Sequence, residues 1–366
     1  MKKQHFLFII ALYVVAVFYL TSTTPISPHE ANIYYSSHDI VSTFMHWGEA
    51  LTDGFLGIRI FSIFFGFLSI ALFYELSRRY FKERRYAYIA TTLFMLLPGV
   101  LTATTLANVA IIVLPLVLFF VLMYERHSFW SLPFVMLALF FIHEASIIFF
   151  VAVLAYGIVH KDKKLSIFSA AFLIAFVYLA KGIEIGGRPS GHFLEIFGLY
   201  ASVFSPLLFF YFFYAMYRIL LREKKTLLWY ISFTALAFSL LLSIRQRVYI
   251  TDFAPYVTIA IILMLDVFNH SVRVRLPEFQ KRYKRAFYVV VSFLVLSVLI
   301  IIFHRMFFYI IKDPSQHFAY RIYKPYFLAK ELKAKGIDCY NDARGREIDQ
   351  LRYYHIGRCK NYRLVY

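Results

Sequence analysis

Long runs of Phe, Leu, Ile, Val and Tyr recur along most of the chain and are separated by short clusters of Lys and Arg. A helix needs about 20 apolar residues to cross the hydrocarbon core of a bilayer, and the longer runs approach that length. Within this core every backbone N–H and C=O group must be hydrogen-bonded internally, so the runs are expected to be helices. The hydrophobic content of 61% exceeds the level of about 45–50% found in soluble domains. The sequence therefore predicts an all-α polytopic membrane protein.

The apolar runs predict about eleven membrane spans. They cover residues 6–23, 56–77, 87–98, 107–124, 130–143, 146–160, 165–182, 200–221, 227–244, 254–269 and 286–304. The first run follows Lys2 and Lys3 as the core of a signal peptide would, but Thr21 to Pro25 contain no A-x-A cleavage site. We therefore expect it to remain as the first helix. The third, fifth and sixth runs are short, and we expect them to tilt, to extend or to span incompletely.

The positive charges predict the orientation of the chain. With the N-terminus inside, 21 of the 39 Lys and Arg residues lie in inside segments, whereas five lie in outside loops before residue 305. Because Lys and Arg are enriched in cytoplasmic loops, the N-terminus is predicted to be cytoplasmic. The net charge of +18 follows from this topology, and scattered loop charges form no basic groove for nucleic acid. Short loops favour the bacterial inner membrane.

The chain is predicted to consist of a transmembrane part at 1–304 and a small extracytoplasmic α/β domain at 305–366. The tail pattern predicts a helix from Pro325 to Gly336, a strand at 337–340, a second helix at 346–356 and a second strand at 362–366. Both cysteines, Cys339 and Cys359, lie in this domain. An oxidising compartment favours a disulfide between them, and the alternative is two unrelated thiols.

Polar residues gather in two predicted outside loops, at 24–55 and 183–199, whereas the inside loops are short and basic. Chemistry is therefore expected on the outer face. The three histidines of the first loop, His29, His38 and His46, have spacings that match no compact metal motif. The sequence assigns no cofactor and leaves open whether a divalent cation takes part.

Several motifs, taken in order, resemble the GT-C membrane glycosyltransferases. The residues are PHEANIYYSSHDI at 28–40, GFLGIRIFSIFFGFLSIALFYELSRRYFKERR at 54–85, LLPGVLTATTLANVA at 96–110, and Arg245, Arg247, Tyr249 and Pro255. They are similar to the family that includes the protein O-mannosyltransferases and the lipid A aminoarabinose transferase. That family has an acidic pair after its first helix and an Arg early in its second. The patches cover about a third of this chain.

The resemblance implies an inverting transferase that moves a sugar from a polyprenyl-phosphate donor to a lipid, glycan or protein acceptor outside the membrane. Such a reaction needs a general base for the acceptor hydroxyl. Glu30 matches the Glu of the acidic pair, and the alternative is a solvated loop acid. His29 and Asn108 stand where the family has Asp. If the missing Asp is the usual base, that role passes to Glu30 or Asp39, or activity is lost.

The cations predicted to hold the lipid phosphate lie on the outer side. Arg holds phosphate through paired donors, and its charge is permanent. The candidates are Arg59, Lys181, Arg188, Arg245 and Arg247, with Tyr249 beside them. The alternatives are that Arg59 snorkels to the interface and that the others attract lipid headgroups.

A histidine and an acid, His143 and Glu144, lie at the turn between two apolar runs. Such pairs perturb each other's pKa and are common at functional sites, so we expect them to bind sugar or acceptor. The alternative is a polar turn at the membrane interface. Two other functions remain open for the whole chain: a flippase or carrier of lipid-linked glycan, and an inactive GT-C-like scaffold.

Overall fold

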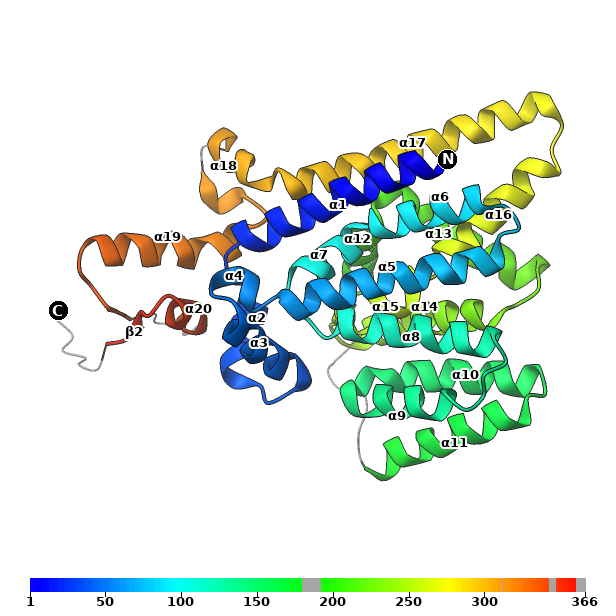
Figure 1. Ribbon diagram of the computed structural model, residues 1–366, viewed down its shortest axis with the longest axis horizontal. Helices are drawn as coiled ribbons and strands as arrows, with labels where there is room; N and C mark the ends of the chain where they lie inside the picture. The colour runs from blue at the N-terminus through cyan, green and yellow to red at the C-terminus, as the bar shows by residue number, and fades with distance from the viewer. Residues whose placement is uncertain (180–191, 312, 342–346, 360–366) are drawn as a thin grey trace. The chain divides into compact units, whose positions relative to one another are not determined.

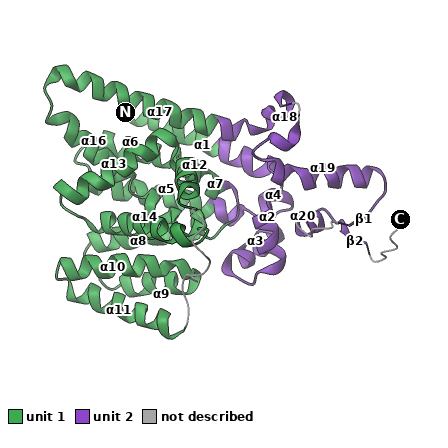
Figure 2. Ribbon diagram, turned by 180° about the vertical axis from the view of Figure 1, so that it is seen from behind, with its two compact units in different colours: residues 1–14, 64–104, 108–299 green, residues 15–63, 105–107, 300–366 purple. Residues whose placement is uncertain are grey.

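The computed structural model describes residues 1–179, 192–311, 313–341 and 347–359, and nearly all of its regular structure is helical (Figure 1). The chain divides into two compact units (Figure 2). Unit 1 comprises residues 1–14, 64–104 and 108–299. Unit 2 comprises residues 15–63, 105–107 and 300–366, so it combines the whole of the predicted loop at 24–55 with the C-terminal tail.

Four helices contain residues of both units: α1 (Lys3–Thr23), α5 (Ile60–Tyr80), α7 (Pro98–Thr105) and α17 (Pro277–Ile302). The other elements of unit 1 follow in chain order: α6 (Arg84–Met95), α8 (Ala110–Glu125), α9 (Leu132–Ile142), η1 (Glu144–Ser146), α10 (Ile147–Val159), α11 (Lys163–Tyr178), α12 (Phe193–Phe204), α13 (Pro206–Arg222), α14 (Leu227–Arg245), η2 (Ile250–Asp252), α15 (Ala254–Thr258) and α16 (Ile261–Arg273).

The core of unit 1 is built from apolar and aromatic side chains. Helix α8 is buried along most of its length, and α10 packs against both α11 and α14. The rings of Phe73 and Phe94 stack with their centroids 4.0 Å apart. At Gly99 a Cβ atom would lie 2.6 Å from Cγ1 of Val203, so only glycine permits this approach. Close packing of this kind fixes the helices against one another.

The structure agrees with an integral membrane protein. Within the described residues, five helices are long and apolar enough to cross a membrane, or up to seven if each of two bent pairs forms one span. The bends measure 62° between α6 and α7 and 106° between α12 and α13. Helices α8, α9 and η1 with α10 are apolar but shorter. The count of eleven spans therefore stays a prediction, because the remaining runs form broken or short helices.

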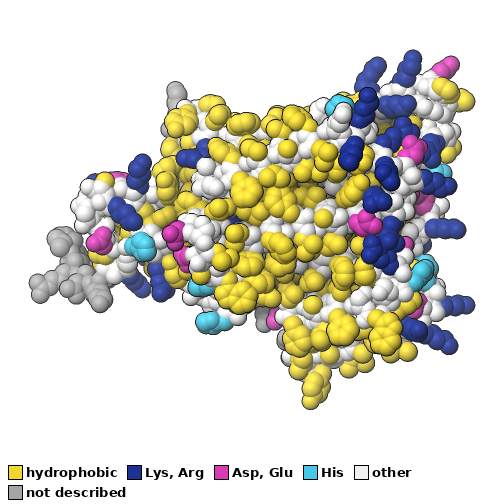
Figure 3. Space-filling model, in the orientation of Figure 1, with side chains coloured by type: hydrophobic (Ala, Val, Ile, Leu, Met, Phe, Trp, Pro, Cys, Tyr) yellow, Lys and Arg dark blue, Asp and Glu magenta, His cyan; other side chains and the backbone are white. Residues whose placement is uncertain are grey.

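The surface of unit 1 has a distinct basic end. Figure 3 shows Lys and Arg side chains along the whole right-hand end, from the junction of α16 and α17 down to the ends of α10 and α11, while apolar side chains cover the neighbouring helical surface. Tyr288, Phe293 and Leu296 of α17 are exposed apolar residues of this kind. An apolar surface beside a basic end is the arrangement expected of a helix bundle in a bilayer.

Unit 2 contains short elements. They are α2 (Pro28–Ser36), α3 (Ile40–Leu51), α4 (Gly54–Gly57), η3 (His304–Met306), α18 (Phe307–Ile310), η4 (Pro314–Gln316), α19 (Tyr320–Ala334), β1 (Cys339–Tyr340), α20 (Ile348–Tyr353) and β2 (Gly357–Arg358). Side-chain caps set the starts of two of its helices. Ser27 and Glu30 form a capping box at α2, and Asp39 accepts a hydrogen bond from the backbone N–H of Ser42 at the start of α3.

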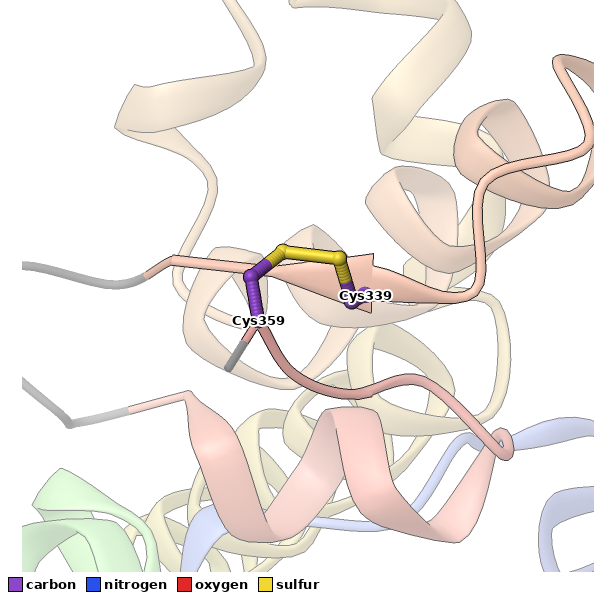
Figure 4. Close-up of a disulfide and its surroundings, with 2 residues drawn as sticks. All are labelled: Cys339 and Cys359. Carbon is purple, nitrogen blue, oxygen red and sulfur yellow. A yellow bond between two sulfur atoms is a disulfide. The ribbon is translucent and has the colours of Figure 1, made fainter. Parts of the chain in front are cut away.

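Within its described residues the tail contains α19, β1, α20 and β2, and a separate α/β domain at 305–366 stays a prediction. The helix predicted from Pro325 begins earlier, at Tyr320, so Pro325 lies inside α19, where it removes one backbone hydrogen bond. Strands β1 and β2 pair in parallel, with Cys339 opposite Gly357. The predicted strand at 362–366 lies outside the described residues. Figure 4 shows the disulfide between Cys339 and Cys359, which confirms that prediction.

Candidate active site

Glu30 lies in the first turn of α2 and is completely buried. Its Oε1 atom accepts hydrogen bonds from Nε of Arg59 at 2.7 Å and from the backbone N–H of Ala107 at 2.8 Å. Its Oε2 atom accepts from Nη2 of Arg59 at 2.7 Å and from the backbone N–H of Ser27 at 2.9 Å. Two carboxylate oxygens have about four acceptor positions, so Glu30 is fully engaged.

Arg59, which lies just before α5, is also completely buried. Besides its contacts with Glu30, its guanidinium donates to the carbonyl oxygens of Thr21, Thr24 and Pro25 at 3.1, 2.7 and 2.9 Å. All five of its N–H groups are therefore used. The carbonyl groups of Thr21 and Thr24 lie at the end of α1 and have no partner further along the helix. Arg59 therefore joins the end of α1 to the start of α2 and does not snorkel.

The environment keeps Glu30 ionised. Burial raises the pKa of its carboxyl group, but the charge of Arg59 and the hydrogen bonds from Arg59, Ser27 and Ala107 outweigh burial and place the pKa below its ordinary value. A carboxylate that is held by four donors and has a low pKa is a weak proton acceptor. In this structure it positions Arg59 and the Ala107 backbone.

The other predicted base, Asp39, is exposed and caps α3. His29, which stands in the place of the family's Asp, is exposed on α2. Asn108, the second departure from the family pattern, is buried, and its Oδ1 atom accepts from the backbone N–H of Ile111 at 3.2 Å. Asn108 therefore supports the start of α8 through its amide oxygen.

A polar and aromatic cluster of unit 2 was not singled out by sequence reasoning. The Tyr34 hydroxyl donates to the Glu49 carboxylate, and the Tyr34 ring stacks on His46 with centroids 4.2 Å apart. The ring of Tyr353 meets Tyr34 edge-on at 6.3 Å, so α2, α3 and α20 meet here. His46 and Glu49 are three residues apart, a spacing that places both on one face of a helix and would have identified them.

In unit 1, His143 ends α9, and its Nε2 atom lies 3.2 Å from Oδ1 of Asp252 in η2. The carboxylate beside His143 is therefore that of Asp252, while Glu144 is exposed. Nearby, the Tyr256 hydroxyl donates to Ser146 at 3.3 Å. The sequence predicted that His143 pairs with the adjacent Glu144, whereas its observed neighbour Asp252 is more than 100 residues away along the chain.

Of the predicted phosphate-binding arginines of unit 1, Arg245 is the last residue of α14 and Arg247 follows the helix. Arg247 donates from Nε and Nη2 to Oε1 of Glu195 at 2.7 and 2.5 Å, and His192 lies 3.0 Å from the other oxygen of Glu195. Arg245 and Tyr249 are exposed. The segment 247–252 connects Arg247 to Asp252, the neighbour of His143. In addition, α12, which carries Glu195, packs against η2, which carries Asp252. Lys181 and Arg188 lie outside the described residues.

The predicted site residues thus form two separate sets. Glu30, Arg59 and Asp39 belong to unit 2, while His143, Glu144, Arg245, Arg247 and Tyr249 belong to unit 1. The expectation that Glu30 shares one cavity with Arg245 and Arg247 connects the two units and stays a prediction. The described residues contain no group of three or more His, Cys, Asp or Glu side chains arranged to hold a metal ion.

No protein-family model matches the sequence, and no curated protein matches it. Two solved structures are similar in fold. ArnT from Cupriavidus metallidurans in the apo state has a TM-score of 0.58 and 16% identity, over 96% of this chain and 84% of that chain. The same protein bound to undecaprenyl phosphate has a TM-score of 0.60 and 13% identity, over 98% of this chain and 85% of that one.

The fold is GT-C-like. The resemblance found in the order of the sequence motifs is therefore confirmed at the level of the fold. A GT-C-like fold over nearly the whole chain also means that both units correspond to parts of one known architecture. At such low identity the comparison describes the fold alone, and the roles of individual side chains depend on their own geometry.

Proposed function

We propose that this chain is an inverting glycosyltransferase that moves a sugar from a polyprenyl phosphate to a cell-envelope acceptor on the extracytoplasmic face. The observation that carries the proposal is the GT-C-like fold over nearly the whole chain, shared with a protein solved with undecaprenyl phosphate bound. In the proposed arrangement the chain has eleven spans in the inner membrane, a cytoplasmic N-terminus and an extracytoplasmic C-terminal domain.

The reaction forms a bond between an acceptor oxygen and the anomeric carbon while the bond from that carbon to the phosphate oxygen breaks. The electron pair of the broken bond leaves with the polyprenyl phosphate, and the acceptor proton passes to a base. Of the two predicted bases, Glu30 is buried and fully hydrogen-bonded, whereas Asp39 is exposed. We assign Asp39 as the base and Glu30 as the positioning residue for Arg59.

The leaving phosphate requires fixed positive charge. Arg245 and Arg247 are assigned this role, with Tyr249, Lys181 and Arg188 as further contacts. Glu195 holds one edge of the Arg247 guanidinium through Nε and Nη2, which leaves its Nη1 donors for a phosphate oxygen. His143 and Glu144 are assigned to the sugar or the acceptor. Oδ1 of Asp252 lies 3.2 Å from Nε2 of His143, so the two residues form an ion pair when the imidazole is protonated, although this Nε2 atom makes no hydrogen bond with a described residue.

Variants of the purified full chain test these assignments. The assay measures free polyprenyl phosphate released from a panel of polyprenyl-phosphate sugars in the presence of an envelope extract as acceptor. Asp39→Asn retains the helix cap, because Asn caps as well as Asp. We expect it to lower kcat about 100-fold through loss of the base. Asp53→Asn is the matched control, since Asp53 is an exposed residue before α4 with no capping hydrogen bond.

The phosphate assignment has a separate outcome. Arg245→Gln with Arg247→Gln should lower kcat/KM by about tenfold or more, because each hydrogen bond to a charged group contributes about 1.5–3 kcal/mol. Unchanged kcat/KM in this variant would remove both arginines from the site. If the wild-type chain releases no polyprenyl phosphate from any donor, the transferase proposal fails.

One observation favours a second candidate, the inactive GT-C-like scaffold. Both positions where the family has Asp are occupied by other residues, and one of these, Asn108, has a structural role at α8. An inactive scaffold would release no polyprenyl phosphate with wild-type chain, and Asp39→Asn would leave its behaviour unchanged. No comparable observation favours the alternative of a flippase or carrier.

A further inference from the structure

A cavity of about 420 Å³ lies at the basic end of unit 1. Its polar lining consists of Arg218 and Arg222 of α13, His270 and Ser271 of α16, and Arg275 between α16 and α17. These residues lie near the C-terminal ends of α13 and α16 and in the connection to α17, which the distribution of Lys and Arg predicts to be on the cytoplasmic side. None of them belongs to the proposed transfer site.

The three arginines of this cavity are held in different ways. Arg218 donates to the Ser271 hydroxyl, and its Nε atom lies 3.2 Å from a carboxylate oxygen of Glu223. The Arg275 guanidinium lies over the ring of Tyr283 at 3.3 Å and donates to the Ser271 carbonyl at 3.2 Å. Arg222 forms no ion pair with any of the described residues. Three guanidinium groups facing one carboxylate leave the cavity with net positive charge.

An apolar groove of about 330 Å³ adjoins this cavity and shares Tyr214 and Ser271 with it. Its walls include Tyr211 of α13, Met264 and Phe268 of α16, and Phe287 and Val290 of α17. These residues precede the basic ends of α13 and α16 and follow the basic start of α17. The groove therefore runs from the charged cavity toward the middle of the helices.

We propose that the cavity binds the phosphate of an anionic glycerophospholipid and that the groove holds one of its acyl chains. Arginine side chains recognise phosphate oxygens through paired donors, which the clustered guanidinium groups supply. The enrichment of Lys and Arg in cytoplasmic loops explains charge at this end, but it does not explain a concave cationic site that opens into an apolar groove. A soluble phosphate ester would use the cavity and leave the groove without a ligand.

Binding to delipidated full chain in zwitterionic micelles tests the proposal. The probe is phosphatidylglycerol, measured by native mass spectrometry and by the shift in thermal midpoint, with phosphatidylcholine and glycerol 3-phosphate as comparisons. We expect phosphatidylglycerol to bind at least about tenfold more tightly than either comparison. Arg222→Gln with Arg275→Gln should weaken its binding about 10–100-fold, through the loss of charge-assisted hydrogen bonds.

The matched control is Arg282→Gln with Arg285→Gln, which removes the same charge from exposed positions on α17 outside the cavity. Binding by this control should stay within about threefold of the wild type. The groove is tested by Val290→Trp, which should weaken phosphatidylglycerol binding and leave glycerol 3-phosphate unaffected. Arg222→Lys should retain most of the affinity for phosphatidylglycerol. If the double variant does not fold, Arg222→Gln alone replaces it in the test, because Arg222 is exposed and its substitution should preserve folding.

Three results would overturn the proposal. Equal weakening by the control variant would show that general positive charge, and not the cavity, attracts the lipid. Equal affinity for glycerol 3-phosphate would identify a site for soluble phosphate esters. Binding of polyprenyl phosphate with no binding of phosphatidylglycerol would assign the cavity to a different lipid.

Discussion

At the scale of single residues, the pair of Glu30 and Arg59 determines how unit 2 is held. Both side chains are completely buried, and every donor of Arg59 and every oxygen of Glu30 is engaged. Breaking one partner of a buried ion pair leaves an uncompensated charge, whereas removing both is far less damaging. The pair is therefore a sensitive point of stability whether or not the chain is an active transferase.

Glu30→Gln is expected to lower the free energy of unfolding by about 3–5 kcal/mol, because the Arg59 guanidinium stays buried without its counter-charge. Adding Arg59→Met to this variant should restore part of the loss, and the difference measures the coupling of the pair. Denaturant titration of the chain in micelles gives both values. The control is Glu195→Gln, whose partner Arg247 is 71% exposed. It should cost less than about 1 kcal/mol. Equal losses of stability in the two variants would contradict the stabilising role assigned to the buried Glu30–Arg59 pair.

The same pair predicts how stability depends on pH. The pKa of Glu30 is lower in the folded chain than its ordinary value of about 4.3, so the unfolded chain binds the proton more readily. Its contribution to stability is therefore complete above that ordinary value and is lost as pH falls toward the lowered pKa. Thermal midpoints measured between about pH 6 and pH 3 should fall more steeply for the wild type than for Glu30→Gln. Parallel curves would contradict this assignment.

At the scale of elements, sequence reasoning succeeded where local chemistry decides the outcome. The apolar runs became helices, and the two cysteines formed their disulfide because no other cysteine competes for either. It failed where distant segments meet. His143 pairs with Asp252 and Glu30 meets Ala107, and no local spacing reveals either contact. The lengths of spans were also uncertain, because α6 with α7 and α12 with α13 bend at breaks that apolar periodicity does not show.

The bend between α12 and α13 has its own test. Ser205 precedes Pro206 and has φ of 79°, in the region that favours glycine, and its side chain is buried. Ser205→Gly should keep or raise the thermal midpoint, since it relieves a backbone conformation that costs about 1–3 kcal/mol in other residues. Ser205→Val should lower the midpoint, because a branched side chain resists positive φ. A lower midpoint for Gly than for Val would show that the backbone at this bend is not the determinant.

The disulfide is expected to stabilise the end of unit 2 locally. It joins β1 to the end of β2 across a separation of 20 residues. Closing a loop of this size contributes about 3 kcal/mol by restricting the unfolded chain. Cys339→Ser with Cys359→Ser should therefore increase amide hydrogen exchange in α20 and the two strands, where Leu351 and Ile356 form a small core with Ala329. Exchange in α8 serves as the internal control and should not change.

At the scale of the whole molecule, the GT-C-like fold and the placement of charge support one account. Unit 1 has a basic end, and Arg245 and Arg247 lie at the C-terminal end of α14. The motif order indicated this architecture, because it depends on the sequence of helices and loops. Glu30 matches the family motif, but the motif does not show that this residue is buried against Arg59.

The most direct test uses proteoliposomes in which the orientation of the full chain is established by protease accessibility of the C-terminal tail. Labelled polyprenyl-phosphate sugars and an envelope acceptor extract are present, and free polyprenyl phosphate and labelled acceptor are both measured. The account predicts transfer only when the acceptor is on the side of the C-terminal tail, with a rate about 100-fold lower for Asp39→Asn. Transfer with the acceptor on the opposite side, or no transfer from any donor by well-folded wild-type chain, would contradict it.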